Sequence, residues 1–264
     1  MNNQHQIVWI TGAASGIGKA LAFEYAGKGA TVILSDRDEN ALNEVVTACN
    51  SGGGKGISAP FDLSKPQEIQ ETANKIIADF PSIDILISNG GISQRSLAIE
   101  TPVEIDRKIM EINFFGAITL TKAILPALIA NGGGDIAVTS SITGKFGFPL
   151  RTAYCASKHA TQGFFEALRA ELYPHNVGIT IVSPGRVKTN ISINALTKEG
   201  KSHGVMDPGQ AGGITPEKCA VKIIRAIRRK RKEILLGGPS VIMVHIRRFF
   251  PPLYHRLVRK VHAT

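Results

Sequence analysis

The sequence predicts a single doubly wound α/β domain with a mostly parallel, seven-stranded sheet between layers of helices. Four observations favour this fold class. Short runs of apolar, β-branched residues alternate with longer helical patterns. These runs are apolar throughout, as in strands that are covered on both faces, and a glycine-rich turn joins the first run to the first helix. A length of 264 residues suits one large domain with a substantial core.

The expected elements follow from these patterns in chain order. The strands are expected at 7–11, 31–35, 56–59, 84–88, 135–140, 178–183 and 233–237. The helices are expected near 17–28, 39–49, 66–79, 103–130, 152–172 and 216–230. Alternation of this length predicts right-handed βαβ units.

One long irregular stretch and one change of composition set the domain organisation. Residues 189–214 have no regular pattern, and inside a compact domain such a stretch is usually a lid or a substrate loop. We therefore expect one α/β domain over 1–238 that includes this lid. A basic, amphipathic extension is expected over 239–264.

The composition is that of a soluble globular protein, with 43% hydrophobic and 20% charged residues. Cys49, Cys155 and Cys219 are widely spaced, which predicts reduced thiols rather than a disulfide framework or a metal site. No signal segment precedes the first strand, and no apolar run approaches the ~20 residues that span a bilayer. We therefore expect a cytoplasmic protein.

The net charge of +10 is concentrated near the C-terminus. From residue 218 onward there are thirteen Lys and Arg but only Glu233 as an acid, whereas the first 217 residues hold 18 basic and 20 acidic groups. Residues 228–232, RRKRK, end a predicted helix, where cations interact favourably with the helix dipole.

The segment 239–262 mixes apolar residues with Arg, Lys and His around Pro251 and Pro252. This composition suits an element that lies in a membrane interface and predicts peripheral membrane contact. The alternative is a helix packed against the sheet or against a partner subunit. Nucleic-acid binding is less favoured, because charge without a reading motif gives only non-specific binding.

The sequence TGAASGIG, residues 11–18, follows the first strand and opens a helix. Glycines at 12, 16 and 18 allow a tight turn that brings backbone N–H groups against a pyrophosphate. The order strand, glycine-rich turn and helix therefore predicts a dinucleotide site of the Rossmann type.

The choice of dinucleotide depends on the end of the second strand. Asp36 is placed to accept hydrogen bonds from the adenosine ribose hydroxyls, which favours NAD(H). The next residue, Arg37, could pair with a 2′-phosphate, so NADP(H) stays open. Ser15 offers no second cation to help it. Asp62, which ends the third strand, fits two roles equally: a hydrogen bond to the adenine amine, or a helix N-cap.

Tyr154 and Lys158 lie four residues apart in TAYCASKHA, residues 152–160, and share one face of the predicted helix. Alone, the pair also fits a surface tyrosine packed over a lysine stem. Together with the glycine-rich turn, its spacing resembles the short-chain dehydrogenase/reductase family.

Further motifs extend this resemblance over essentially the whole chain. SNGG, residues 88–91, looks like the family's Asn-Asn-Ala-Gly, with Ser88 and Gly90 as departures. INFFG, residues 112–116, matches the family's helix asparagine and gives Asn113.

Two more motifs fit the same family. Ser141 stands thirteen residues before Tyr154, where the family keeps its catalytic serine, so we prefer it to the neighbouring Ser140. SPGRVKT, residues 183–189, resembles the family's Pro-Gly segment, with Thr189 placed to bind the nicotinamide end.

The resemblance implies an NAD(P)-dependent oxidoreductase that interconverts a secondary alcohol and a ketone, with no metal. The implied catalytic residues are Asn113, Ser141, Tyr154 and Lys158. The implied cofactor contacts are Gly12, Ser15, Gly16, Ile17, Gly18, Asp36, Arg37, Asp62, Leu63, Asn89, Gly90, Tyr154, Lys158, Pro184, Gly185, Val187 and Thr189.

The roles implied for the catalytic residues follow from the reaction. Tyr154 gives a proton to the substrate oxygen, and we expect the Lys158 ammonium to lower its pKa from about 10. Ser141 stabilises the charge that develops on that oxygen. Asn113 is expected to hold a water that links Lys158 to solvent.

The segments 113–126, 158–172 and 190–207 resemble a branch of the family that includes a membrane-associated reductase of lipid ketones. This implies a hydrophobic, lipid-like substrate. Because no membrane anchor precedes the first strand, we expect a soluble or peripheral protein.

Three further expectations concern assembly, two arginines and the alternative function. The family commonly pairs its long helices, here 103–130 and 152–172, which implies a homodimer or homotetramer. Arg95 and Arg186 fit ordinary surface charges better than phosphate ligands. The alternative function is a non-catalytic, cofactor-binding regulatory or scaffold protein that uses the basic tail to bind membrane or nucleic acid.

Overall fold

The computed structural model describes residues 6–260 and is built on one sheet of seven strands in the order β3-β2-β1-β4-β5-β6-β7. The strands are β1 (Ile7–Thr11), β2 (Thr31–Ser35), β3 (Lys55–Ser58), β4 (Ile85–Ser88), β5 (Gly134–Thr139), β6 (Val177–Pro184) and β7 (Glu233–Leu236). Every neighbouring pair is parallel, so the sheet is wholly rather than mostly parallel. The strand order reverses between β1 and β4, and such a switch point is where ligands bind in open α/β sheets.

The six expected helices lie close to their predicted places, although 103–130 is divided, and the helices at 208–211, 242–249 and 251–258 are additional. In chain order the helices are α1 (Gly16–Ala26), α2 (Glu39–Ser51), α3 (Pro66–Asp79), α4 (Val103–Met110), α5 (Gly116–Ala130), α6 (Thr152–Glu171), α7 (Pro208–Ala211), α8 (Pro216–Arg228), α9 (Ile242–Phe249) and α10 (Pro251–Val258). Side-chain caps help to set some starts: the Asp38 carboxylate accepts from Ala41 N–H before α2, and the Thr215 hydroxyl accepts from Lys218 N–H before α8.

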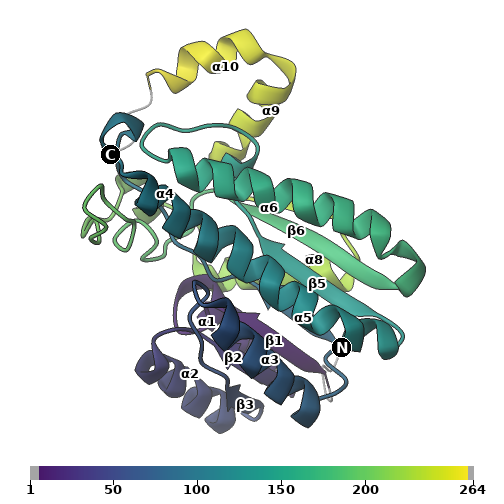
Figure 1. Ribbon diagram of the computed structural model, residues 1–264. Helices are drawn as coiled ribbons and strands as arrows, with labels where there is room; N and C mark the ends of the chain where they lie inside the picture. Colours follow the sequence, from purple (N-terminus) through teal and green to yellow (C-terminus); the bar gives the residue numbers. More distant parts are fainter. Residues whose placement is uncertain (1–5, 261–264) are drawn as a thin grey trace.

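Helices cover both faces of the sheet (Figure 1), and one apolar core lies on each face. Helices α1, α2 and α8 contribute to one core, and α3, α5 and α6 contribute to the other. Val8, Trp9 and Ile10 of β1 are fully buried, because the central strand is covered on both sides. The Trp9 indole N–H donates to the Ser35 hydroxyl at 2.9 Å, so this large side chain is buried without an unpaired donor.

The helix expected over 103–130 is broken by a π-helical turn at Glu111–Phe115. Such turns inside α-helices often mark functional sites. This helix also corrects the expectation that no segment is apolar enough for a bilayer. Val103–Ala130 is long and apolar enough to cross a bilayer, by length and composition, with a mean hydropathy of 1.6 in its most apolar window. It lies against the sheet, however, with 44% of that window buried inside the protein (Figure 1).

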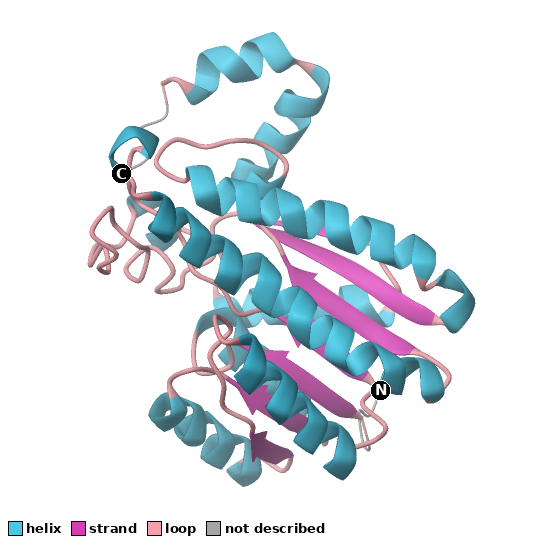
Figure 2. Ribbon diagram, viewed as in Figure 1, coloured by secondary structure: helices cyan, strands magenta, loops and turns pink. Residues whose placement is uncertain are grey.

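The segment 189–214 is irregular except for the short helix α7, and Figure 2 shows it as a long loop beside the sheet. We call it the lid. It docks on the strand-like segment after β4: Leu196 N–H donates to the Ser93 carbonyl at 2.9 Å, and Arg95 N–H donates to the Leu196 carbonyl at 2.8 Å. The lid is therefore held in place by backbone hydrogen bonds as well as by side chains.

The chain after β7 is helical and folds back toward the lid end of the sheet (Figure 1). Helices α9 and α10 pack their apolar side chains against the loop that follows β5, around Ile142 and Phe146. The expected amphipathic extension therefore forms two helices, and its last residues, 261–264, lie outside the described part of the chain.

The basic charge near the C-terminus is divided between two places. The cluster RRKRK at 228–232 lies just before β7, whereas the cations of α9 and α10 come after it. Since β7 runs between them, the two clusters lie at opposite ends of a strand. The sequence suggested one basic tail, but the fold makes two separate basic surfaces.

Candidate active site

A cleft of about 830 Å³ opens at the carboxyl ends of the central strands. It is lined by the glycine-rich loop, the ends of β2, β4, β5 and β6, helix α6, the lid and the start of the C-terminal segment. All the predicted catalytic and cofactor-binding residues line this cleft except Gly18 and Asn113. The residues singled out by motif therefore meet in one place.

The glycine-rich loop leaves no room for side chains. A Cβ at Gly18 would lie 2.0 Å from the Gly12 carbonyl oxygen, so only glycine fits at this buried position. Gly12 has φ +65°, and a Cβ there would lie 2.7 Å from the Gly90 Cα. The result is a bare backbone cradle at the N-terminus of α1, which fits the diphosphate of a dinucleotide.

The end of β2 is fixed toward this cradle. The Asp36 carboxylate accepts from the Ala14 N–H and from the Asp38 N–H, each at 3.2 Å. Arg37 is exposed, although it also lines the cleft. The acid is therefore held in place by two backbone hydrogen bonds, whereas the guanidinium extends into solvent.

Asp62 is not the N-cap of α3, because Lys65 occupies that position. Its Oδ1 accepts from both the N–H and the hydroxyl of Ser64 at 2.8 Å. Burial raises the pKa of Asp62, but these hydrogen bonds and the nearby Arg37 outweigh burial and leave the pKa below its usual value. Asp62 thus faces the cleft as an ionised acceptor, which favours the adenine role of the two we considered.

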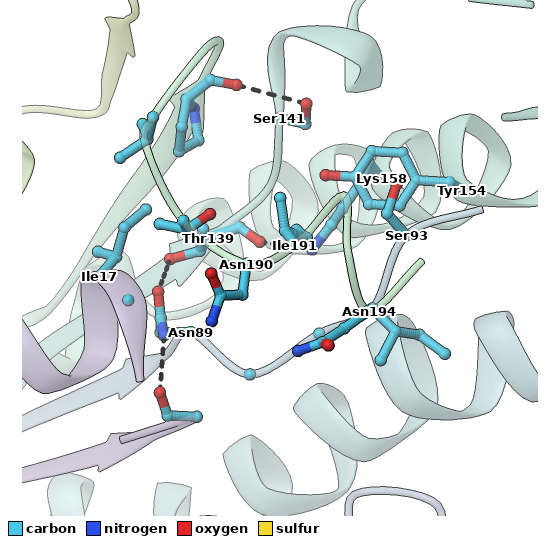
Figure 3. A pocket seen from close by; sticks show the side chains of 18 of the residues that line it. Ile17, Asn89, Ser93, Thr139, Ser141, Tyr154, Lys158, Asn190, Ile191 and Asn194 are labelled. Carbon is cyan, nitrogen blue, oxygen red and sulfur yellow. Dashed lines mark hydrogen bonds between the residues drawn. The ribbon is translucent and has the colours of Figure 1, made fainter. Parts of the chain in front are cut away.

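Asn89 connects the central strands beneath the cofactor cradle (Figure 3). Its backbone N–H donates to the Thr11 hydroxyl at 3.0 Å, and its side chain accepts from the Thr139 hydroxyl at 3.3 Å. Ser88, where the family has a second asparagine, is buried, and its hydroxyl has no hydrogen-bond partner among the described residues. Of Ser88 and Asn89, it is therefore the Asn89 side chain that joins the strand ends.

Tyr154 and Lys158 project from the first turns of α6 into the cleft, as their spacing predicts (Figure 3). Both are buried, with exposures of 8% and 4%. The Lys158 ammonium lies 5.8 Å from the centre of the Tyr154 ring and donates to the Thr139 carbonyl at 2.8 Å. The ammonium is therefore anchored to β5 beside the phenol rather than bonded to its hydroxyl.

Ser141 is the better placed of the two neighbouring serines. The Ser140 hydroxyl donates to the Lys158 carbonyl at 3.0 Å and accepts from Gln162, so it is used in joining β5 to α6. The Ser141 hydroxyl donates to the Pro184 carbonyl over a long 3.3 Å and lines the cleft near Tyr154 (Figure 3). A substrate oxygen could take over this weak hydrogen bond.

Burial moves the pKa values of the tyrosine and the lysine in opposite directions. It raises the pKa of Tyr154, although Ser141 and Arg151 act to lower it. It lowers the pKa of Lys158 to about 8. Our expectation that Lys158 lowers the pKa of Tyr154 below its ordinary value is therefore not met in this structure. The phenol is protonated at neutral pH, which is the state that a general acid requires.

Asn113 lies in the π-helical turn and is 2% exposed. Its side chain accepts from the Ile92 N–H at 2.8 Å and donates to the Ile92 carbonyl and to the Ser157 hydroxyl. These bonds tie the turn to the segment after β4 and to α6. Because the Asn113 side chain already makes these hydrogen bonds within the protein, a water beside Lys158 would have to bind the Asn113 backbone. The expected water therefore stays a prediction.

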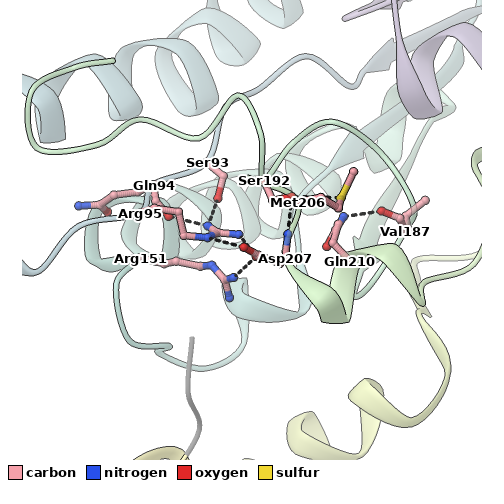
Figure 4. Close-up of polar contacts among 9 residues, drawn as sticks. All are labelled: Ser93, Gln94, Arg95, Arg151, Val187, Ser192, Met206, Asp207 and Gln210. Carbon is pink, nitrogen blue, oxygen red and sulfur yellow. Dashed lines mark hydrogen bonds and ion pairs between the residues drawn. The ribbon is translucent and has the colours of Figure 1, made fainter. Parts of the chain in front are cut away.

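A buried ion cluster lines the cleft, and Figure 4 shows its contacts. Asp207 of the lid binds Arg95 through both carboxylate oxygens and binds Arg151 at 2.9 Å. The side chains of Arg95 and Asp207 are 5% and 10% exposed. The expectation of a surface charge is therefore wrong for Arg95, because the lid covers it. Arg186 is exposed, as expected, at the edge of the cleft.

Comparison with known proteins agrees with this geometry. The sequence profile described as short chain dehydrogenase matches residues 6–200. The chain belongs to the short-chain dehydrogenase/reductase family. It is therefore an oxidoreductase that acts with NAD(P), and the scaffold alternative is not needed.

Relatives in this family cover nearly all of the chain. It is 42% identical to dehydrogenase/reductase SDR family member 7B of Xenopus laevis, over 97% of this chain and 81% of that protein. It is 39% identical to dehydrogenase/reductase SDR family protein 7-like of Drosophila melanogaster, over 97% of this chain and 80% of that protein.

Solved structures share the fold of this dehydrogenase/reductase. A short-chain dehydrogenase/reductase from Burkholderia phymatum, in complex with NAD, superposes with a TM-score of 0.85 at 24% identity, covering 96% of each chain. A short-chain dehydrogenase from Burkholderia cenocepacia J2315, in complex with NADP, superposes with a TM-score of 0.82 at 24% identity, covering 99% of this chain and all of the other.

Several residues that shape the active site of this dehydrogenase/reductase have no motif. The Gln94 side chain is fully buried and accepts from the N–H groups of Ala153 and Tyr154, so it caps the helix that carries Tyr154 and Lys158. Ser93 of the same segment, and Asn190 of the lid, also line the cleft (Figure 3). Glutamine and serine after a strand are common, so only the folded arrangement identifies them.

Proposed function

We propose that this oxidoreductase interconverts a secondary alcohol and a ketone on a hydrophobic, lipid-like substrate. The observation that carries the proposal is an apolar wall of the cleft into which Tyr154 projects. Phe146, Phe148 and Met243 line the same cleft as Tyr154 and Ser141. A pocket with apolar walls and a few placed polar groups fits a substrate whose carbonyl is its main polar feature.

Tyr154, Ser141 and Lys158 each have a separate role in this reaction. A bound nicotinamide supplies or accepts the hydride. In the reductive direction the Tyr154 hydroxyl donates its proton to the carbonyl oxygen. The Ser141 hydroxyl donates a hydrogen bond to the same oxygen as negative charge develops there, and the Lys158 ammonium stabilises the phenolate that remains.

A panel of aliphatic ketones with increasing alkyl length, read by nicotinamide absorbance, tests the substrate class. If the substrate is lipid-like, kcat/KM should rise by up to about fourfold for each CH₂ that the wall buries, at ~0.8 kcal/mol per CH₂. Equal or falling kcat/KM along the series would contradict a lipid-like substrate while leaving the oxidoreductase class intact.

We propose that NAD(H) is preferred over NADP(H), because the fixed carboxylate of Asp36 would meet a 2′-phosphate at the adenosine end. Asp36→Gly should therefore shift the preference toward NADP(H) by at least about tenfold, since it removes the repulsion and leaves Arg37 to pair with the phosphate. Titration of both reduced cofactors by nicotinamide fluorescence measures this. Tighter binding of NADPH by the unchanged protein would overturn the proposal and make Arg37 the deciding residue.

We also propose that the protein is a cytoplasmic homodimer or homotetramer, with the layer of α5 and α6 as its interface. Phe115 and Ile129 are 44% and 37% exposed on that layer, and Ala167 of α6 is also exposed. Ala167→Arg should then yield monomers in sedimentation velocity at micromolar concentration, whereas Glu44→Arg on the opposite layer should not. Sedimentation of the unchanged protein as a monomer would contradict this assembly.

A further inference from the structure

The corner between α9 and α10 exposes large apolar side chains. Phe249 and Phe250 are 67% and 63% exposed, and Leu253 of the next turn is 45% exposed. Pro251 begins α10 directly after the two phenylalanines, so the corner is a fixed turn rather than a continuous helix. We call Phe249, Phe250 and Leu253 the apolar corner. An exposed group of this kind normally marks an interaction surface.

The apolar corner is not needed to hold the two helices on the protein. Their inner side does this: Tyr254 is buried, its hydroxyl donates to the Gly147 carbonyl, and its ring lies 5.8 Å from that of Phe146. Val244 and Ile246 pack in the same cluster. The helices therefore have a packed inner side, whereas the apolar corner stays exposed among residues 6–260, which the structure describes.

The segment that carries the apolar corner has charges of one sign. Residues 239–260 contain five Arg and Lys and no Asp or Glu. Arg248 and Arg256 flank the corner and are exposed. A second copy of this chain, bound face to face, would bring the same cations together, whereas anionic headgroups would be attracted to them.

We propose that the apolar corner is a docking surface for an anionic lipid bilayer, into which Phe249, Phe250 and Leu253 insert. Exposed aromatic and apolar side chains beside cations are the composition of peripheral elements in the membrane interface. The same segment reaches the cleft, since Pro239, Ser240 and Met243 line it. Docking thus brings one wall of the substrate cleft to the membrane surface, which deepens the proposed lipid-like substrate class.

Flotation with vesicles of phosphatidylcholine and phosphatidylserine in equal parts tests the docking without any measurement of activity. Phe249→Ser together with Phe250→Ser should weaken binding at least about tenfold, because the variant loses most of its inserted apolar area. Arg248→Ser together with Arg256→Ser should weaken binding about 30-fold at low salt, at ~1 kcal/mol for each cation near the surface.

The matched control is Arg228→Ser together with Arg229→Ser, which removes the same charge from the exposed cluster before β7. It should bind vesicles as the unchanged protein does. Unchanged thermal melting and NADH binding would show that each variant is folded.

Equal losses from the two arginine pairs would overturn the proposal, because net charge rather than the corner would then drive binding. Flotation of the variant with Phe249→Ser and Phe250→Ser at the wild-type level would also overturn it. A third outcome would overturn it as well: the unchanged protein fails to float but forms a dimer, and the double phenylalanine variant is monomeric. A second copy of the chain would then cover the apolar corner. Failure of the ketone panel with successful flotation would leave the docking surface in place and reject only the substrate class.

Discussion

Tyr154→Phe should lower kcat at least about 100-fold while leaving NADH affinity nearly unchanged. The substitution deletes the proton donor and keeps the ring, which is 8% exposed and packs in the first turns of α6. The wild-type phenol is protonated at neutral pH, because burial raises its pKa. Only the proton transfer is therefore removed. Turnover at the wild-type rate would mean that another group supplies the proton.

The pH dependence gives an independent check on the same residue. Reduction needs the protonated phenol, which is present at neutral pH, so its rate should change little between pH 6 and about 8. Oxidation needs the phenolate, whose fraction grows as the pH rises toward a raised pKa. The rate of alcohol oxidation should therefore increase with pH in the wild type, and this increase should be absent in Tyr154→Phe.

Lys158→Met should abolish most activity and yet stabilise the folded protein at pH 7. Burial lowers the pKa of Lys158 from 10.5 to about 8. At ~1.4 kcal/mol per pKa unit, burying this charge costs up to about 3 kcal/mol below pH 8. Methionine removes that cost but leaves the Thr139 carbonyl without its donor, which offsets about 1–2 kcal/mol. A net gain of about 1–2 kcal/mol in the free energy of unfolding is expected at pH 7.

The sign of this effect can be tested by raising the pH. Between pH 8 and 10.5 the unfolded chain binds more protons at this lysine than the folded chain, so wild-type stability rises across that window relative to the variant. Urea denaturation at pH 7 and pH 9.5 should show the advantage of Lys158→Met shrinking. An advantage that grows with pH would show that the lysine is not destabilised by burial.

The fold could be predicted from the sequence because its signals are local. Continuously apolar runs such as residues 7–11 and 31–35 are strands in the structure, since a sheet covered on both faces has no polar side to alternate with. The sequence did not predict the π-helical turn at Glu111–Phe115. Its composition is that of the helix on either side, and the Asn113 bonds that accompany it involve distant segments.

The candidate site divides along the same line. Spacing within one element placed Tyr154 and Lys158 together, because positions i and i+4 of a helix share a face. The ion cluster could not be predicted in this way, since Arg95 and Asp207 are 112 residues apart in the sequence. Arginine and aspartate are usually exposed, so neither residue alone suggests burial. The pair is buried because the lid docks over it.

The packing of the C-terminal helices has a consequence for how the enzyme could diversify. The strand and helix units that hold the cofactor end at β7, whereas Met243 of the substrate wall is encoded after it. Exchange of the coding sequence beyond the glycines at 237 and 238 would replace one wall and keep Ser141, Tyr154 and Lys158, which all precede it. The substrate class and the docking surface that we propose share this segment, so they would then be inherited together.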